Sequence, residues 1–261
     1  MPTVTAHAPG TFSWPELATS DPNAAKKFYT TLFGWQFKDN DMGPSGVYTI
    51  FTREGKDCAA VYKLDANMAQ TGMPPFWGTY ITVESADTAA AKAKALGGKV
   101  VQEPFDVMDF GRMAVITDPQ GATFCVWQAK KNIGIHVYGE PNSLGWTQLN
   151  ASDTAAAKKF YTGLIGWKVQ EDAIPGGGGT YTTWLKADGP AGGMMAMPPG
   201  EKAPSHWLPY FAVTNVDATA KQAATLGAKT YMPPTDIPGT GRFAVFADPQ
   251  GATFAIVTFK K

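Results

Sequence analysis

One stretch of sixteen residues occurs twice in this chain, and this repeat limits what the chain can fold into. Residues 20–35 and 152–167 agree at twelve of the sixteen positions, at a constant offset of 132. Each copy starts with Ser-Asp, continues through alanines and lysines to Phe-Tyr, and ends in Gly-Trp. Because Asp favours a helix start and Gly a helix end, each copy predicts a capped helix of about three turns that runs into a strand.

A second stretch repeats at nearly the same spacing. Residues 118–124 and 248–254 both read DPQGATF, at an offset of 130, and Trp77 and Trp207 share that offset. A fixed period over such a distance is the signature of an internal duplication. The sequence therefore predicts two copies of one domain.

Composition excludes several classes of protein. With 44% hydrophobic and 12% aromatic residues, a chain of 261 residues can bury two cores. Lys plus Arg equals Asp plus Glu at 22 each, and no basic run occurs, which argues against nucleic acid or an anionic membrane as partner. No apolar span of membrane length and no secretory leader pattern is present, so we expect a cytoplasmic protein. The two cysteines, Cys58 and Cys125, do not suggest a disulfide framework.

The order of expected elements is the same in each half. Residues 12–18 read as a strand, 22–33 as a helix, and three short strands follow before the order restarts at Trp77. Each half is thus β-α-β-β-β twice. We predict an α+β fold with one domain at 8–130 and the other at 143–261, joined by a connector of low periodicity.

The motifs that carry this order resemble a known family. A strand, then S-D-x-x-A-x-x-F-Y-x-x-x-x-G-W, and later D-P-x-G-x-x-F, is similar to the vicinal oxygen chelate superfamily of glyoxalases, extradiol dioxygenases and bleomycin resistance proteins. The two-copy layout most resembles the two-domain glyoxalase-like antigens of mycobacteria. The resemblance implies four βαβββ modules whose mixed sheets curl around cleft-shaped cavities. It also implies an internal pseudo-dimer, so we expect a monomer in solution.

The resemblance also says where metal-dependent members hold their ion. Their ligands lie on the first strand, the fourth strand, the fifth strand and the last strand of a domain. The matching positions here are Trp14, Trp146, Ala60, Met195, Gly78, Leu208, Cys125 and Ala255. Divalent metals need several converging imidazole or carboxylate ligands, which these residues do not supply. We therefore expect no bound metal and no cofactor.

The three histidines do not restore such a site. His7 lies in the lead-in, His136 in the connector and His206 at the start of a strand, and we interpret all three as solvated loop or strand-end residues. His206 is next to Trp207 and could line the rim of the second cavity. Nothing in the sequence orients it as a base.

Alternation along the strands places aromatic and polar residues on the inward faces. Aromatic walls with a few polar groups suit a flat, partly apolar ligand, although the same residues could simply fill the core. Glu16 favours the binding interpretation, because an acid is costly to bury unless it is paired or functional. Arg112 and Arg242 could supply its partner, or could instead contact Asp118 or the backbone. The predicted ligand-binding residues are Trp14, Glu16, Tyr80, Cys125, Trp127, Trp146, Gln148, Asn150, His206 and Tyr210.

Two classes of function follow. The first is a metal-free protein that binds a small, aromatic or partly apolar molecule in a cleft, as the resemblance to bleomycin resistance proteins implies. The alternative is a glyoxalase- or lyase-type enzyme acting on a small carbonyl compound, with Glu16 as the candidate catalytic base.

Overall fold

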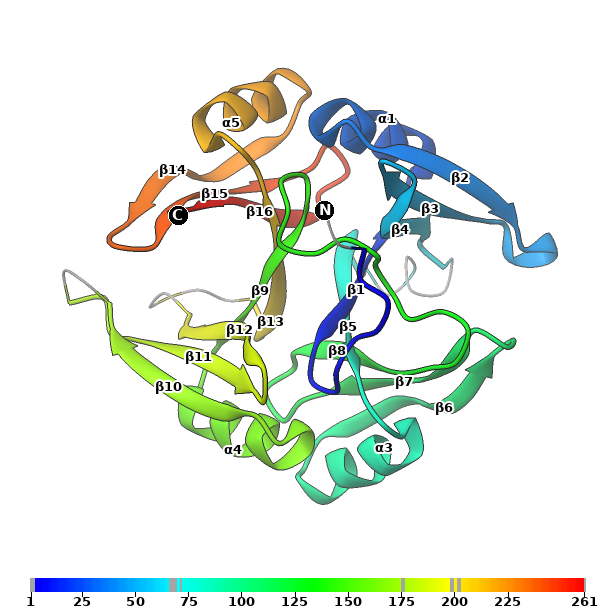
Figure 1. Cartoon of the computed structure of the whole chain (residues 1–261), viewed down its shortest axis with the longest axis vertical. Coiled ribbons are helices and arrows are strands. Elements are labelled where there is room, and N and C mark those ends of the chain that lie inside the picture. The colour runs from blue at the N-terminus through cyan, green and yellow to red at the C-terminus, as the bar shows by residue number, and fades with distance from the viewer. Residues whose placement is uncertain are drawn as a thin grey trace.

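The computed structural model describes residues 3–65, 70, 72–174, 177–197, 200 and 203–260, and within them each half of the chain forms one eight-stranded sheet (Figure 1). The elements of the first half are β1 (Phe12–Thr19), α1 (Pro22–Phe33), β2 (Gln36–Asp41), the short 3-10 helix η1 (Gly43–Ser45), β3 (Val47–Arg53), β4 (Lys56–Lys63), β5 (Phe76–Thr82), α3 (Ala86–Ala95), β6 (Lys99–Val107), β7 (Gly111–Thr117) and β8 (Thr123–Ala129). Those of the second half are β9 (Ser143–Ala151), α4 (Thr154–Ile165), β10 (Lys168–Ala173), β11 (Thr180–Lys186), β12 (Gly189–Ala196), β13 (His206–Ala212), α5 (Val216–Thr225), β14 (Lys229–Ile237), β15 (Gly241–Ala247) and β16 (Thr253–Phe259).

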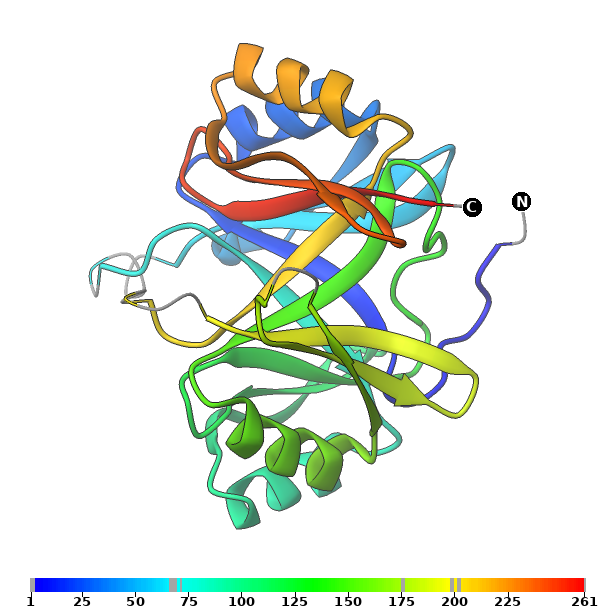
Figure 2. The ribbon, with the colours of Figure 1, turned by 90° about the vertical axis from the view of Figure 1, so that its left-hand side faces the viewer.

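Both sheets have the same strand order. The first runs β2-β3-β4-β1-β5-β8-β7-β6 and the second β10-β11-β12-β9-β13-β16-β15-β14. In the first sheet, β1 pairs parallel with β4, and antiparallel with β5, which joins the two modules of the half. The helices lie in two pairs at opposite ends of the molecule, with the strands between them (Figure 2). The predicted α+β fold of four βαβββ modules is confirmed.

Capping explains where the first helix begins and ends. The Asp21 side chain accepts hydrogen bonds from the backbone N–H groups of Asn23 and Ala24, and Gly34 ends the helix with a left-handed φ of 69°. Asp153 and Gly166 do the same for α4. Only glycine adopts that C-terminal conformation without steric cost, so the repeated Gly-Trp ends both helices at the same point.

The two halves meet through their repeated motifs. The Tyr29 hydroxyl of α1 donates to Asp248 Oδ2 of the second half at 2.9 Å, and the Tyr161 hydroxyl of α4 donates to Asp118 Oδ2 of the first half at 3.1 Å. All four residues are buried. The helix motif of each half therefore binds the DPQG turn of the other, which is the reciprocity that an approximate two-fold axis requires.

Aromatic side chains surround both of these contacts. Trp77 Nε1 donates to the Tyr29 hydroxyl at 2.9 Å, and Trp207 Nε1 donates to the Tyr161 hydroxyl at 3.1 Å. The Tyr29 ring meets the Trp77 ring edge-on, with 5.2 Å between centroids. Edge-on packing and a satisfied N–H are the usual conditions under which a buried Trp stabilises a core.

That the chain is a monomer in solution stays a prediction.

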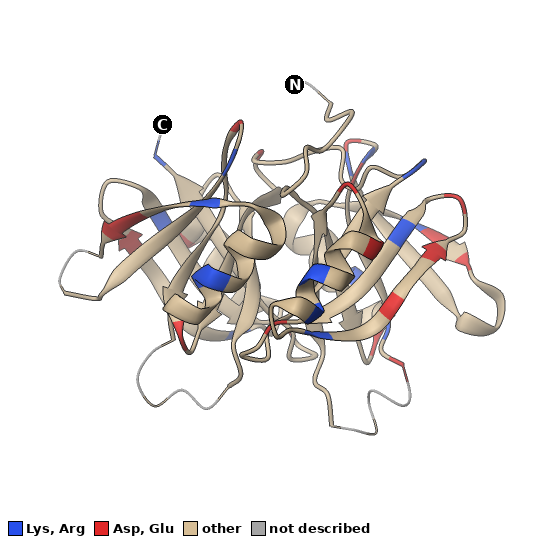
Figure 3. Cartoon of the chain, turned by 90° about the horizontal axis from the view of Figure 1, so that it is seen from below, with Lys and Arg blue, Asp and Glu red and all other residues tan. Residues whose placement is uncertain are grey.

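Charged residues lie on the outer elements, with both signs interspersed (Figure 3). The ion pair of Lys26 with Asp39 recurs in the second half as Lys158 with Glu171, each between the first helix of the half and the strand after it. Within the described residues, no helix is both long and apolar enough to cross a membrane.

The reciprocal contacts predict matched losses of stability. Tyr29→Phe removes one buried donor and leaves the Trp77 N–H and an Asp248 oxygen without their partner, so we expect a loss of about 1–3 kcal/mol in the free energy of unfolding. Tyr161→Phe should cost a similar amount, because its surroundings are equivalent. Urea unfolding measures both, with Tyr231→Phe as a control at an exposed position. A loss no larger than that of the control would contradict the role given to these contacts.

Candidate functional site

The predicted site residues lie on the inner faces of the two curved sheets. Side chains alternate along a strand, and the register sets Trp14 opposite Tyr80 and Glu16 opposite Gly78. Leu17, on the other side of β1, packs in the cluster that holds Phe28 of α1. The first inner face is defined here by Trp14, Glu16, Tyr48, Tyr80, Cys125 and Trp127. The second inner face is defined by Trp146, Gln148, Asn150, Tyr181, His206 and Tyr210.

Glu16 is the central polar group of the first inner face. The Tyr48 hydroxyl donates to its Oε1 at 2.5 Å, and the Tyr80 hydroxyl donates to its Oε2 at 2.7 Å. Trp14 Nε1 in turn donates to the Tyr48 hydroxyl at 3.0 Å. Glu16 is half-buried, and two phenols hold its carboxyl in place.

Burial decides the protonation chemistry of this cluster. It raises the pKa of Glu16 above the ordinary value of 4.5, although the hydrogen bonds from Tyr48 and Tyr80 oppose the shift. Burial, followed by the nearby Glu16 charge, raises the pKa of both tyrosines well above their usual range. The phenols therefore remain protonated donors, and the carboxyl is the group that titrates.

Cys125 and Trp127 complete the apolar side of the first inner face. Burial raises the pKa of the Cys125 thiol, so it is not a thiolate nucleophile near neutral pH. The Trp127 ring meets the Tyr80 ring edge-on at 6.3 Å between centroids, and its Nε1 donates to the carbonyl of Asn132. A Cβ at Gly111 would lie 2.3 Å from the Trp127 ring, so this glycine makes room for the indole.

The second inner face has different polar groups. Trp146 Nε1 donates to the Tyr181 hydroxyl at 2.8 Å, as Trp14 does to Tyr48. Gln148, which replaces Glu16, donates from Nε2 to Asn150 Oδ1 at 2.9 Å. Asn150 Nδ2 lies 3.0 Å from His206 Nε2. This face has no carboxyl group.

The structure thus brings the ten predicted residues together in two groups of five, one on each inner face. Sequence reasoning missed the tyrosines of the third strands, Tyr48 and Tyr181. A signal was available, because the two recur at an offset of 133 and stand in strands that the alternation predicts. Tyr62 of β4 was missed as well, and its ring stacks on Tyr48 at 6.4 Å between centroids.

The two arginines pair neither with Glu16 nor with Asp118, two of the roles that the sequence left open for them. Arg112 donates from Nε and Nη2 to both carboxyl oxygens of Asp87 in α3, at 2.7 and 2.8 Å, and Arg242 does the same with Asp217 in α5. These hydrogen bonds do not involve Asp118 or its counterpart Asp248. The reason is alternation, because Arg112 is on the helix-covered side of β7 and cannot reach the inner face.

Two histidines are also less exposed than expected. His7 Nε2 donates to the carbonyl of Ile135 at 2.8 Å, and His136 Nδ1 lies 3.7 Å from Asp57 Oδ2. Burial lowers the pKa of His7. The lead-in and the connector bind each other, which half-buries residues that the sequence placed in solvated loops.

The residues present do not fit a divalent metal ion. In the first half, the positions that match the family's ligands are Trp14, Ala60, Gly78 and Cys125, and Glu16 stands in register with both Ala60 and Gly78. Its two oxygens already accept from tyrosines, and the matching position on β8 offers the thiol of Cys125, whose pKa is raised by burial. Nowhere in the described part of the chain do three His, Cys, Asp or Glu side chains group as ligands would. Metal sites need several such ligands at once.

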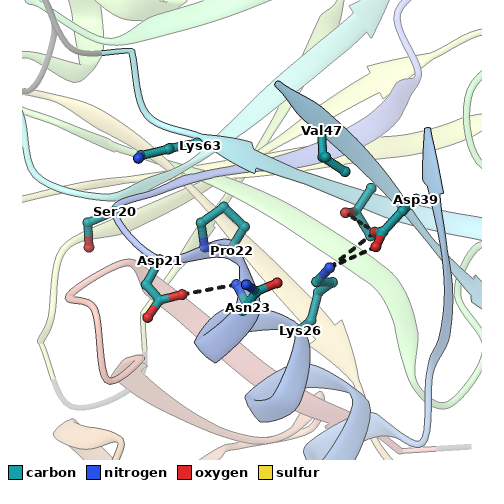
Figure 4. Close-up of a pocket in the computed structure, with 9 residues that line it drawn as sticks. Ser20, Asp21, Pro22, Asn23, Lys26, Asp39, Val47 and Lys63 are labelled. Carbon is teal, nitrogen blue, oxygen red and sulfur yellow. Dashed lines mark hydrogen bonds and ion pairs between the residues drawn. The ribbon is translucent and has the colours of Figure 1, made fainter. Parts of the chain in front are cut away.

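A surface pocket of about 400 Å³ lies away from the inner faces, between the start of α1 and strands β2 to β4 (Figure 4). Lys26 pairs with Asp39, which also accepts from the Thr49 hydroxyl at 2.6 Å, while Asp21 caps the helix. The acids of this pocket are therefore engaged by neighbouring groups. We place the candidate site on the first inner face, where a half-buried carboxyl is surrounded by aromatic rings.

A fold of paired βαβββ modules with this inner face belongs to a recognised class. The chain is a member of the Glyoxalase/Bleomycin resistance protein/Dioxygenase superfamily, whose model matches residues 11–126 and 143–256. The resemblance stated from the motifs is confirmed.

Two relatives extend over the whole chain. The chain is 42% identical over 258 residues to "Putative glyoxylase CFP32" of Mycobacterium tuberculosis (strain CDC 1551 / Oshkosh), with 98% of both proteins covered. It is 35% identical over 268 residues to "Anthracycline biosynthesis protein DnrV" of Streptomyces peucetius, with 99% of this chain and 96% of the relative covered.

Solved structures share the fold. The Mn(II)-bound glyoxalase from Novosphingobium aromaticivorans aligns with a TM-score of 0.66 at 18% identity, covering 96% of this chain and 82% of that one. The 2,3-dioxygenase LapB from Pseudomonas sp. KL28 aligns with a TM-score of 0.63 at 16% identity, covering 100% of this chain and 95% of that one. At such identities the likeness concerns architecture alone.

The raised pKa of Glu16 predicts a pH dependence of stability. Since the folded protein binds this proton more tightly than the unfolded chain, the stabilisation is complete below the unfolded value and is lost as pH rises through the folded pKa. Glu16→Gln removes that loss. The unfolding free energy of the variant, relative to wild type, should therefore rise as the pH increases above the ordinary pKa of 4.5.

Urea unfolding at a series of pH values measures this difference. Glu84→Gln serves as the control, because it removes an exposed carboxyl outside the inner faces. A Glu16→Gln difference that stays constant or falls with rising pH would show that burial does not raise this pKa.

Proposed function

We propose that the chain binds a flat, partly aromatic small molecule at the first inner face, without a metal ion, and that Glu16 recognises a cationic or hydrogen-bond-donating group of that molecule. The observation that carries the proposal is the half-buried Glu16 carboxyl, held at 2.5 and 2.7 Å by two phenols. A buried carboxylate is costly unless it is paired, and a ligand donor would complete its pairing.

The aromatic residues around this carboxyl support a flat ligand. Tyr62 stacks on Tyr48, and both rings are half-buried, so each retains accessible surface. Trp14 and Trp127 flank the carboxyl from β1 and β8, with their N–H groups already bonded. Both indoles are buried, so the rings with accessible apolar surface for a planar ligand are those of Tyr48 and Tyr62.

The relatives support the same class of ligand. The superfamily description includes bleomycin resistance, and one relative is named for anthracycline biosynthesis. Anthracyclines are planar and polycyclic, and many carry a protonated amine, which matches an aromatic wall around a carboxylate. An anthracycline that bears an amino sugar is therefore a suitable probe, and its amine-free aglycone is the matched control.

Titration calorimetry with these two probes tests the proposal. We expect the amine-bearing probe to bind more tightly than the aglycone. Glu16→Gln should weaken the amine-bearing probe by about 1–3 kcal/mol, the scale of a lost charge-assisted hydrogen bond, and should affect the aglycone little.

Gln148→Ala, at the equivalent position of the second half, should leave both affinities unchanged. Equal effects of Glu16→Gln and Gln148→Ala would refute the assignment to the first face. If neither probe binds, the proposed ligand class is wrong.

A second candidate function is proton transfer on a small carbonyl compound. The raised pKa of Glu16 favours it, because a general base is most effective when its pKa approaches the working pH. The two phenols would orient the carboxyl. This candidate requires turnover that Glu16→Gln abolishes while Tyr48→Phe alters its pH profile, whereas a binding protein shows neither.

Metal content separates the proposal from the metal-dependent chemistry of the superfamily. We expect protein purified without chelators to contain less than stoichiometric zinc, nickel, manganese and iron, because the inner-face donors do not fit them. Elemental analysis by mass spectrometry measures this, with melting curves at added metal as a second readout. One metal ion per chain, or a large rise in melting temperature with one metal, would overturn the metal-free part of the proposal.

A further inference from the structure

The second inner face differs from the first by a set of coupled replacements. Gln148 stands where the first half has Glu16, and Asn150 stands where it has Ala18. His206 replaces Phe76 at the start of the neighbouring strand, and the register sets it opposite Asn150. An acid and two apolar residues have thus become two amides and an imidazole, which hydrogen-bond one another.

The direction of these hydrogen bonds follows from one carbonyl. His206 Nδ1 lies 3.0 Å from the Pro204 carbonyl oxygen, which can only accept, so Nδ1 carries the proton. In the neutral ring Nε2 then accepts, and Asn150 Nδ2 is its donor at 3.0 Å. Asn150 Oδ1 accepts from Gln148 at 2.9 Å. Asn150 therefore has one amide hydrogen bonded to His206 and a second one available.

Tyr181 supplies another available donor. Its oxygen accepts from Trp146 at 2.8 Å, and no residue in the described ranges is found to accept its proton, whereas the counterpart Tyr48 donates to Glu16. The hydroxyl lies over β12, where a Cβ at Gly193 would stand 2.1 Å from it. The first half has Ala60 at this register position. Gly193 therefore lets the Tyr181 hydroxyl occupy a position different from that of the Tyr48 hydroxyl.

The second inner face is partly exposed to solvent. Trp146, Asn150, Tyr181 and His206 are all half-buried rather than enclosed. None of the six residues that define the second inner face is Asp or Glu, so none of them carries a negative charge that would repel an anionic group. Hydrogen-bond donors that lack an acceptor and are partly shielded from water favour a ligand that accepts hydrogen bonds.

We propose that the second inner face is a separate binding site for a small aromatic molecule bearing an acceptor oxygen, of a carboxylate or a ketone, which Tyr181 Oη–H and the second Asn150 Nδ2–H recognise. This site does not depend on ligand binding at the first face. The Trp146 ring, whose N–H is already bonded, provides the flat apolar surface beside the two donors. The duplicated protein thus carries two sites of opposite hydrogen-bonding character.

A pair of matched probes tests this assignment with the full-length chain. The acceptor probes are 2-naphthoate and 2-acetylnaphthalene, and the donor probe is 2-naphthylmethylammonium, which has the same ring system. Calorimetry should show that Tyr181→Phe and Asn150→Ala each weaken the acceptor probes by about 5- to 10-fold, the size of one neutral hydrogen bond. Asn150→Ala introduces the residue that the first half has at this position, Ala18. Tyr181→Phe removes only the hydroxyl, and melting curves verify that each variant is folded.

Tyr48→Phe and Glu16→Gln supply the matched controls in the first half. They should leave the acceptor probes unaffected, while Glu16→Gln weakens the ammonium probe. If neither acceptor probe binds, or if the first-half changes weaken them as much as the second-half changes do, the second site is refuted. That result is independent of the ammonium probe, which reports on the first face alone.

Discussion

The hydrogen bonds from Tyr29 to Asp248 and from Tyr161 to Asp118 hold the two halves in their relative position. Each joins the repeated helix of one half to the repeated turn of the other, and each Asp also accepts from its own turn at the backbone N–H groups of Gln120 and Ala122 or of Gln250 and Ala252. One carboxyl thus shapes a turn and binds the neighbouring domain. The positions where the halves agree most are those that face each other across the pseudo-two-fold axis.

This arrangement leaves the inner faces free to differ. The interface uses the helix-covered side of each sheet, where Leu17, Phe28 and Phe254 pack in one cluster. Alternation sends neighbouring residues such as Glu16 to the opposite side. A substitution on the inner face therefore leaves the contact between the halves intact, which is why Glu16 and Gln148 can differ while Tyr29 and Tyr161 remain the same.

The chemistry of the first inner face depends on one carboxyl, that of Glu16, whose pKa is raised by burial. Phenol donors, rather than a cation or a metal ion, stabilise its charged form. A charge held only by neutral donors remains able to attract a cation or a donor, whereas a charge paired with arginine does not. In the second face the same position holds an amide that binds Asn150, and the acidic character is gone.

From the repeats and the alternation alone, the sequence determined the duplication, the four βαβββ modules, the capped helices and which residues of β1, β5 and β8 share a face. These follow from local rules, because caps, turns and a period of two depend on near neighbours in the chain. It could not show that Tyr48 reaches Glu16 or that Arg112 turns to Asp87. Those contacts join residues 32 and 25 positions apart, and only the pairing of strands and the seating of α3 brings them together. Tertiary structure alone decided that the helix motif of each half binds the turn of the other, since this contact spans 219 residues in one copy and depends on how two finished sheets pack.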